Sequence, residues 1–528
     1  MNKLERIKAE KDGLEIRKDL ERFAREGWES ISEDDLERLK WVGLFLRKPT
    51  PGFFMLRVRI PNGYTYSHQV KALADIAEEF GNGLLDITTR QQVQVRHLKI
   101  DDVLEVFQRL EAVGLTSLQT GLDNIRNIMG CPVAGLQSQE ILDASPLVRE
   151  MTEHFLGNTE FTNLPRKFNI VLTGCPHNCL EAETQDLAFV PATRELNGKE
   201  VTGFNVLAGG KMGSGGYRIA SPLDVFVAPE ETVEVASAVV ALYRDYGNRE
   251  LRTANRFAFL LEDWGEARFR KELVKRLGRP LASAGQDRRL VQKLDHVGIY
   301  RQKQPAFNYV GLKVVTGRIR AAQFREAALL SERYGTGELR LTPTQNIVLP
   351  HVHDKKLGDL LEESLLKELL YAPFGLTRHL VACVGSDYCS LAAIETKARA
   401  VEVAQKLEAR LESAEPLSIH WSGCPAGCGN HLVGDIGLLG KRIRLNGEVI
   451  EAVDIFVGGR AGPQPHPATR IMENVPCERL PDVLQQLAPY HTREKMHPVR
   501  DRKPRRARAR MPEEEETPRA PPSLRSSA

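Results

Sequence analysis

The sequence lacks long apolar runs and an excess of either charge. No stretch of about 18 apolar residues occurs in its 528 residues, so we expect no membrane-spanning helix. The 73 basic and 70 acidic residues give a formal net charge of +3, which predicts binding to neither nucleic acid nor a membrane surface. The N-terminal stretch MNKLERIKAEKDGLEIRKDLERF is charged throughout and has no apolar signal-peptide region. We therefore expect a cytoplasmic protein.

Cysteine is also scarce, with eight residues in the whole chain. In a cytoplasmic protein such cysteines are metal ligands or buried thiols more often than disulfides. Hydrophobic residues make up 42% and charged residues 27%, which is typical of soluble globular proteins. The length predicts about three domains.

The two ends of the chain differ from its middle. Residues 1–48 are charged and carry apolar residues at helical spacing, which predicts an N-terminal helical wrap. Residues 496–528 contain a basic block, an acidic block and then Pro and Ser, and almost nothing there can enter a core. We interpret this segment as a disordered, solvated tail, although its basic block would also suit an acidic partner.

Between these ends the sequence repeats itself. LLDITTRQQVQV at 84–95 matches ELRLTPTQNIVL at 338–349, an offset of 254 residues. TGCPHNCLEAETQDLAFV at 173–190 matches SGCPAGCGNHLVGDIGLL at 422–439, an offset of 249. Two long blocks repeated in the same order indicate gene duplication and pseudo-twofold symmetry, and the period is too long for a solenoid.

The repeat predicts an α+β fold with three structured regions. FFMLRVRIP has the alternation of a strand, SHQVKALADIAEEFG that of a helix, LLDITTRQQVQVRHL that of a second strand and DDVLEVFQRLEAVG that of a second helix. This order fits half of a ferredoxin-like unit, and two such halves would join into one domain. We name residues 49–285 copy 1 and residues 286–495 copy 2. The predicted half-domains are 49–117 and 286–372, and the blocks with cysteines and Gly-rich loops are 118–285 and 373–495.

Four cysteines in copy 2 form two closely spaced pairs. Cys383-x5-Cys389 and Cys424-x3-Cys428 are separated by 34 residues. Two such pairs on two loops can supply the four thiolates of a [4Fe–4S] cluster, and the small residues around them let backbone N–H groups approach the sulfurs. A zinc site or four unconnected thiols are the alternatives, although zinc favours Cys-x2-Cys spacing.

The pattern Cys-x5-Cys followed by Gly-Cys-Pro-x2-Cys resembles the signature of the sirohaem nitrite and sulfite reductase family. The resemblance covers about residues 20–490 and is strongest to its ferredoxin-dependent nitrite reductases. It implies sirohaem and one [4Fe–4S] cluster as cofactors, and it implies that Cys428 also ligates the sirohaem iron. GGKMGSGG lacks the spacing of a dinucleotide loop, and no flavin or nicotinamide domain is recognisable. We therefore expect reduced ferredoxin as the electron donor, and a monomer.

Copy 1 keeps only part of the cysteine pattern. Cys175 and Cys179 match Cys424 and Cys428, but only Cys131 lies in the region aligned with the other pair. Three thiols can still bind a metal, yet we interpret them as a degenerate relic of the duplication. Cys477 fits no pattern and is predicted to be a buried thiol.

The resemblance also implies cations that hold an anionic substrate and supply protons. The matching positions are Arg57, Arg126 and Lys167. Two residues beyond Lys167 stands Asn169, where sulfite reductases of this family tend to carry a lysine and nitrite reductases an asparagine. A neutral amide suits monoanionic nitrite, so Asn169 favours nitrite as the substrate.

Further positions are predicted to bind the carboxylates of sirohaem. They lie in two turns that the repeat relates and in two Gly-rich loops. They are Arg90, Gln91, Arg96, Thr342, Gln345, Asn346, Gly209, Gly210, Lys211, Gly458, Gly459 and Arg460.

The predicted function is the six-electron reduction of nitrite to ammonium. Electrons would enter at the cluster and pass through Cys428 to the sirohaem iron. Three alternatives stay open from the sequence. They are a sulfite reductase forming sulfide, a precorrin-3B synthase-like enzyme that keeps the cluster without sirohaem, and a non-enzymatic interaction protein with a structural zinc site.

Overall fold

Four five-stranded sheets, surrounded by α-helices, form the described part of the chain. The computed structural model describes residues 2–487, except 197, 214, 292, 374 and 411–416. The tail predicted over residues 496–528 lies outside these residues. The strands and helices confirm the α+β class. No helix among the described residues is both long and apolar enough to span a bilayer.

The first sheet belongs to copy 1 except for one edge strand. Its order is β1 (Leu44–Arg47), β2 (Thr50–Val58), β5 (Val93–Leu98), β4 (Leu84–Ile87) and β13 (Arg318–Arg320). Helices α4 (Ser67–Glu79) and α5 (Val103–Ala112) pack with it. The single strand predicted for LLDITTRQQVQVRHL is wrong. The segment forms two antiparallel strands, because a turn at 88–92 places Gln91 in the left-handed region at φ +57°.

The second sheet is the copy 2 counterpart, and the two copies exchange one strand each. Its order is β11 (Gly298–Arg301), β12 (Phe307–Leu312), β15 (Ile347–His353), β14 (Glu338–Leu341) and β3 (Tyr64–Tyr66). Its helices are α9 (Ala321–Tyr334), α10 (Asp354–Glu362) and α11 (Ser364–Glu368). Helix α9 packs against α4, and one hydrophobic core contains side chains of both copies. The two ferredoxin-like halves therefore form one folded unit, as predicted.

The repeat extends to the backbone conformation. Non-glycine residues in the left-handed region recur at the 254-residue offset, with Gln91 at φ +57° and Gln345 at φ +66°, and with His97 at φ +61° and His351 at φ +60°. The two glutamines also make equivalent bonds across the pseudo-twofold axis. Gln91 Nε2 donates to Leu341 O at 3.0 Å, and Gln345 Nε2 donates to Ile87 O at 3.0 Å. Each amide thus joins one half to the other.

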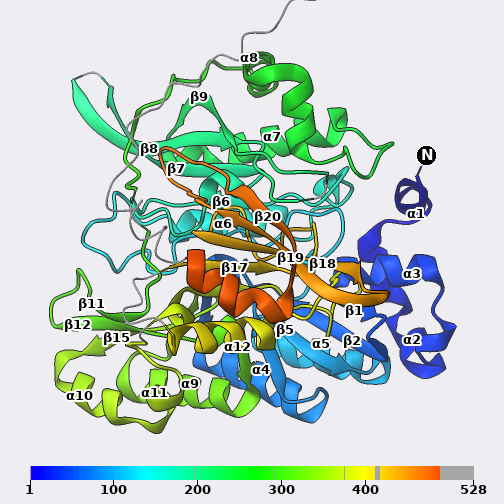
Figure 1. The fold of residues 1–528 in the computed structure, drawn as a ribbon. Coiled ribbons are helices and arrows are strands. Elements are labelled where there is room, and N and C mark those ends of the chain that lie inside the picture. The colour runs from blue at the N-terminus through cyan, green and yellow to red at the C-terminus, as the bar shows by residue number, and fades with distance from the viewer. Residues whose placement is uncertain are drawn as a thin grey trace, which may run out of the picture.

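The other two sheets carry the cysteine loops. In copy 1, β6 (Ile170–Leu172), β7 (Leu187–Leu196), β8 (Lys199–Ala208), β9 (Ser221–Val227) and β10 (Gln286–Asp287) pack with α6 (Ser145–Phe155), α7 (Thr232–Tyr246) and α8 (Phe257–Leu277). In copy 2 the strands are β16 (Leu380–Ala382), β17 (Ile419–Ser422), β18 (Ile436–Leu445), β19 (Glu448–Val457) and β20 (Thr469–Pro476), with α12 (Lys397–Glu408). In Figure 1 the strands β17–β20 lie between the copy 1 block at the top and helices α4 and α9–α11 at the bottom.

The N-terminal segment forms helices at the side of the molecule, as Figure 1 shows. They are α1 (Lys3–Glu10), α2 (Leu20–Glu26) and α3 (Glu33–Arg38). Trp41 follows them, is 1% exposed, and donates from Nε1 to Thr162 O at 3.1 Å. The segment is therefore anchored to copy 1. Strand β1 already begins at Leu44, inside the predicted wrap.

A buried carboxylate, Asp86 on β4, holds both copies together. Arg96 of β5 donates to Asp86 Oδ2 at 2.6 Å, while Arg318 of β13 and Lys397 of α12 each lie 3.1 Å from Oδ1. Asp86 is 3% exposed. The three cations hold the pKa of this carboxyl well below its usual range, against the desolvation that would raise it.

Replacing Asp86 with Asn should destabilise the enzyme, because three buried cations would lose their counter-ion. Removing one partner of a buried ion network costs about 3–5 kcal/mol. We expect a clear fall in the melting temperature of the purified enzyme. Because the folded-state pKa is lowered, the difference from wild type should be complete above about pH 5 and shrink as pH falls below about 4.

Asp75→Asn is the matched control. Asp75 lies on α4, has a 53% exposed side chain and pairs with Arg325 at 2.7 Å. An exposed pair contributes at most about 1 kcal/mol. Equal melting temperatures for the two variants would contradict the role given to Asp86.

Candidate active site

A cavity of about 970 Å³ lies between the first sheet and the cysteine loops of copy 2. Strand alternation decides which side chains reach it. Leu56 and Val58 of β2 point into the hydrophobic core, whereas Met55 and Arg57 line the cavity. On β5, Val93 and Val95 enter the hydrophobic core, while Gln94 and Arg96 line the cavity. The floor of the cavity is thus the polar face of a sheet whose other face is core.

All four cysteines of the copy 2 pattern line this cavity, which brings together residues 45 positions apart. The wall also contains many cations and a few polar side chains. The charged and sulfur-bearing members are Arg47, Arg57, Asp86, Arg90, Arg96, Cys383, Cys389, Lys397, Cys424 and Cys428.

Positive charge predominates in the wall. Five of the lining residues are Arg or Lys, and among the described lining residues Asp86 is the one carboxylate. Asp86 is already engaged by Arg96, Arg318 and Lys397. Cations left without a counter-ion in a low-dielectric site are costly, so the cavity is built for a group with several negative charges.

The cost of burying these positive charges is seen in the lowered pKa values of three arginines. Burial, together with repulsion from Arg47 and Arg90, lowers the pKa of Arg57 to about 9. Burial also lowers the pKa of Arg90 and of Arg47. The Arg57 guanidinium donates to Thr120 O at 3.0 Å but forms no ion pair among the described residues. An anion bound here would compensate this charge and restore the ordinary pKa values.

A second, small cavity shares Thr89, Arg90 and Ala426 with the first. Lys167 and Asn169 line it. Burial, with Arg90 and Arg256 nearby, lowers the pKa of Lys167 well below its usual value. The position of Asn169 is fixed through its backbone, which donates to Asp186 Oδ2 at 2.9 Å, while its Oδ1 is buried without a hydrogen-bond partner. An unpartnered amide oxygen beside a lysine fits a bound polar ligand or water.

Arg126 lies beside Arg57 but lines neither of these two cavities. Its guanidinium donates to Thr120 O and, at 2.7 Å, to Leu122 O, and its Nε has no partner. Thr120 O accepts a hydrogen bond from both arginines, so the two guanidinium groups share one acceptor. The structure therefore brings Arg57, Lys167 and Asn169 to the cavities, whereas Arg126 lines neither of the two.

The four thiols are unpaired and suit a cluster better than a single ion. Zinc holds sulfurs at about 2.3 Å, so tetrahedral ligand sulfurs would lie about 3.8 Å apart. Among the described residues, no three of these cysteines lie within 4.8 Å of one another. A cubane bonds each thiolate to a different iron and needs wider spacing. Gly423 N also donates to Cys383 Sγ at 3.1 Å, as backbone amides do around cluster sulfurs.

Cys428 is the thiol that faces the cations. It is exposed, whereas the other three are half-buried. The charge of a Cys428 thiolate acts on Arg57, Arg90 and Lys167, opposing the fall in their pKa values. Thr89 Oγ1 donates to Cys428 O at 3.2 Å and joins the turn of copy 1 to this loop. A group bound to Cys428 would therefore lie against the cationic face.

Of the residues predicted to bind sirohaem carboxylates, Arg90, Arg96 and Gln345 line the larger cavity. Several others are engaged in the fold itself. Gln91 donates to three backbone carbonyls, and Thr342 and Asn346 stabilise their own turn. Lys211 lies 3.3 Å from the ring centre of Phe259, and Arg460 is exposed and donates to Gln464 O.

The two predicted glycine pairs play matching structural roles. Gly209 N and Gly210 N donate to Asp186 O and Gln185 O, and Gly458 N and Gly459 N donate to Asp435 O and Gly434 O. These bonds are related by the 249-residue offset. Among the described contacts, the four amides are thus committed to backbone pairing. Gln345 is committed as well, because its side-chain amide bonds Ile87 O and the backbone of Ala382. Arg90 and Arg96 are therefore the best placed of the predicted set.

Sequence reasoning missed several residues of the site. Arg47 and Lys397 line the larger cavity and Arg256 the smaller one, where Arg256 pairs with Asp186 at 2.8 Å. Arg96 and Arg318 both stack on Tyr388, which lies between Cys383 and Cys389. Arg47, Arg256 and Lys397 belong to no repeated or cysteine-containing motif, whereas Tyr388 lies inside the first cysteine pair and could have been noticed there.

Together, the duplicated α+β fold and a cationic cavity bordered by four cluster-spaced thiols define a class of iron–sulfur oxidoreductase acting on small anions. The chain belongs to the nitrite and sulphite reductase family. Residues 46–113 and 300–366 match its ferredoxin-like half domain, and residues 121–281 match its 4Fe-4S domain.

Similar proteins cover nearly the whole chain. It is 45% identical to the ferredoxin–nitrite reductase of Synechococcus elongatus, over 92% of this chain and 96% of that protein. It is 41% identical to the chloroplastic ferredoxin–nitrite reductase of Zea mays, over 92% of this chain and 89% of that protein. The solved structure of the Mycobacterium tuberculosis NirA protein superposes with a TM-score of 0.86 at 29% identity, covering 92% of each chain. Family membership confirms the predicted cofactors, sirohaem and a [4Fe–4S] cluster.

Replacing Cys383 with Ala should remove the cluster, because a cubane needs all four thiolates. We expect acid-labile sulfide to fall to background in the purified protein, with most of the iron lost. Cys477→Ala is the control, since Cys477 is 3% exposed in the separate core of copy 2. Full sulfide content in the Cys383 variant would refute this ligand assignment.

Proposed function

We propose that this enzyme reduces nitrite to ammonium with electrons from reduced ferredoxin. The observation that carries the proposal is the single cavity in which four cluster-spaced thiols face cations without counter-ions. The names of the relatives, ferredoxin–nitrite reductases of a cyanobacterium and a plant, support the same substrate and donor. Nitrite takes up six electrons and eight protons to give ammonium and two waters, so the site must bind an anion and deliver protons.

Residues around the cavity fit both cofactors, as their charge and thiol spacing indicate. Cys383, Cys389, Cys424 and Cys428 would hold the cluster, and Cys428 would also contact the sirohaem iron. Arg47, Arg90, Arg96 and Lys397 would pair with sirohaem carboxylates. When bound, the two cofactors supply electrons one at a time.

Arg57 and Lys167 have different tasks in this scheme. With a pKa of about 9, Arg57 stays protonated at neutral pH and binds the nitrite anion electrostatically. Lys167 has its pKa lowered by burial and by Arg90 and Arg256, so its Nζ releases a proton more readily than an ordinary lysine. We assign Lys167 Nζ as the donor to nitrite oxygens as the N–O bonds break. Arg126 keeps Arg57 in place through Thr120 O.

Asn169 supports nitrite over sulfite. It lines the same cavity as Arg90, Lys167 and Arg256 and adds no charge to them. A lysine at this position would add a further cation, which would favour dianionic sulfite more than monoanionic nitrite. A zinc site would need sulfurs closer together than those of the four cysteines in the larger cavity. We further propose that the enzyme is a cytoplasmic monomer.

Cys428→Ser should break the electronic link between the cluster and the haem iron. Loss of the shared sulfur should remove the spectroscopic coupling of the two centres and bring nitrite reduction to background. Electron paramagnetic resonance and turnover with a chemical reductant measure the two effects, with Cys477→Ser as the control. Nitrite turnover at the wild-type rate would contradict the proposed electron path.

Asn169→Lys should shift the preference toward sulfite, since it adds a cation beside Lys167. We expect the ratio of kcat/KM for sulfite to that for nitrite to rise about tenfold, which corresponds to about 1.4 kcal/mol. Steady-state kinetics with one electron donor give the ratio, and Asn169→Gln controls for side-chain size. An unchanged ratio would show that Asn169 does not select the substrate.

A further inference from the structure

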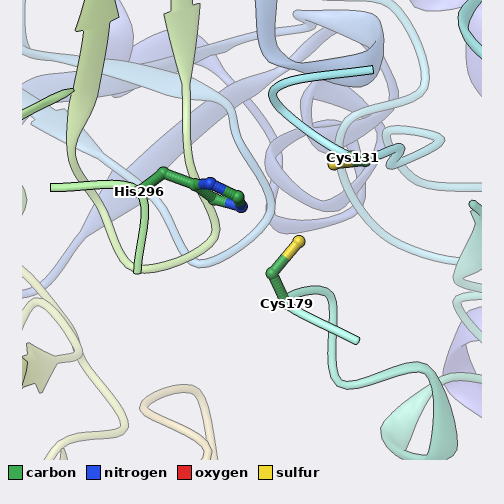
Figure 2. Close-up of side chains that lie close together, drawn as sticks. All are labelled: Cys131, Cys179 and His296. Atoms are coloured by element: carbon green, nitrogen blue, oxygen red, sulfur yellow. The ribbon is translucent and has the colours of Figure 1, made fainter. Parts of the chain in front are cut away.

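A second group of side chains that could hold a metal lies where the cysteine loop of copy 1 meets the start of copy 2. The donor atoms of Cys131, Cys179 and His296 all lie within 4.8 Å of one another, and no other such group of three occurs among the described residues. The side chains are 1%, 5% and 1% exposed. Figure 2 shows them converging from three separate segments, with His296 opposite the two thiols. Their spacing is that of ligands around a single ion.

His296 is oriented as a metal-binding histidine is. Its Nδ1 lies 3.4 Å from the Tyr309 hydroxyl, while its Nε2 is buried without a hydrogen-bond partner. Metal-ligating histidines typically donate through one ring nitrogen to a neighbouring acceptor and bind the metal through the other. With Nδ1–H donating to Tyr309, the lone pair of Nε2 is free to bind a metal.

A fourth donor lies next to this group. Cys175 lies in the same buried cluster as Cys131 and Cys179, and its thiol interacts with that of Cys131. Cys175 Sγ currently donates to Gln137 Oε1 at 3.1 Å, and Cys175 is 2% exposed. A rotation of this thiol away from Gln137 would complete a set of three cysteines and one histidine. That set is one of the standard ligand combinations of structural zinc sites.

The pseudo-twofold symmetry explains why this site would hold one ion rather than a second cluster and sirohaem. At the 254-residue offset, the positions of Arg57, Arg90 and Arg96 are occupied by Gly311, Thr344 and Pro350. The cationic face has therefore been lost. Tyr309 stands where Met55 lines the other cavity, and it packs with Val348 in one apolar cluster with the three cysteines.

The loss of the arginine also made room for the histidine. A Cβ added to Gly311 would lie 1.6 Å from His296 O, so no side chain fits at that position. The backbone of His296 thus approaches where the copy 1 sheet carries Arg57. His296 itself adopts φ +58°, a conformation that is uncommon outside glycine.

We propose that Cys131, Cys179 and His296, completed by Cys175, bind one structural Zn²⁺ ion. The ion would join the cysteine loop of copy 1 to the segment that leads into β11 of copy 2. The surroundings are buried and apolar, and a site with four protein ligands has no position for a substrate, which indicates a structural role. The copy 1 counterpart of the cofactor site would then still bind a metal ion but would no longer take part in electron transfer.

Elemental analysis of the wild-type holoenzyme tests the proposal. We expect about one zinc per chain in addition to the cluster and haem iron. Zinc should be lost in Cys179→Ala and in His296→Ala, together with a lower melting temperature, while acid-labile sulfide and sirohaem are retained. Cys477→Ala should keep the zinc. Wild-type enzyme with iron but no zinc, or zinc retained in a Cys179/His296 double alanine variant, would overturn the proposal.

X-ray absorption at the zinc edge identifies the ligands in the wild-type protein. This test therefore remains valid even if the alanine variants do not fold. We expect about three sulfurs near 2.3 Å and one nitrogen near 2.0 Å. A shell of oxygens would indicate adventitious zinc and refute the assignment. A disulfide among Cys131, Cys175 and Cys179, detected by mass spectrometry of the unreduced protein, would refute it as well.

Discussion

A surplus of buried positive charge around one cavity is the constraint on which the rest of the structure depends. Burial lowers the pKa values of Arg47, Arg57 and Arg90, and repulsion from the other two lowers that of Arg57 further, while Asp86 is already shared among three other cations. Such an arrangement is unfavourable until anions arrive. A polycarboxylate tetrapyrrole and an anionic substrate supply the missing charge, so binding both is the natural way for this cavity to become stable.

The duplication separates the two requirements of the site between the copies. The polar face of the copy 1 sheet supplies the cations, and the loops of copy 2 supply the thiols. This division works only if the copies are held in fixed register. The exchanged strands β3 and β13, the paired glutamines Gln91 and Gln345, and the ion network of Asp86 provide that register. The same contacts that stabilise the fold therefore hold the four thiols of copy 2 against the cations of copy 1.

Local patterns in the sequence predicted much of this arrangement. The repeat predicted the paired half-domains, and the cysteine spacing predicted which thiols share a cavity. The role expected for Gln91 was less well founded, because a motif cannot show whether an amide faces a ligand or a neighbouring carbonyl. Arg256 and Lys397 were missed for a related reason. Their importance comes from what the fold places opposite them, and neither residue stands in a pattern that its own neighbours would reveal.

The same limit applies to His296, which lies in neither cysteine block and has no counterpart in the repeat. Its position follows from what copy 2 lost, since Gly311 lets the backbone before β11 approach the sheet where an arginine would exclude it. Loss of charge on one sheet face thus has two consequences. It removes the reason to bind an anionic cofactor, and it opens space for a neutral nitrogen ligand beside three thiols that duplication had already placed there. The two copies have thus diverged in the groups that they bind at equivalent positions. The sheet face of copy 1 kept the cations that bind anions, whereas the equivalent face of copy 2 lost them and leaves room for a metal ion held by protein side chains.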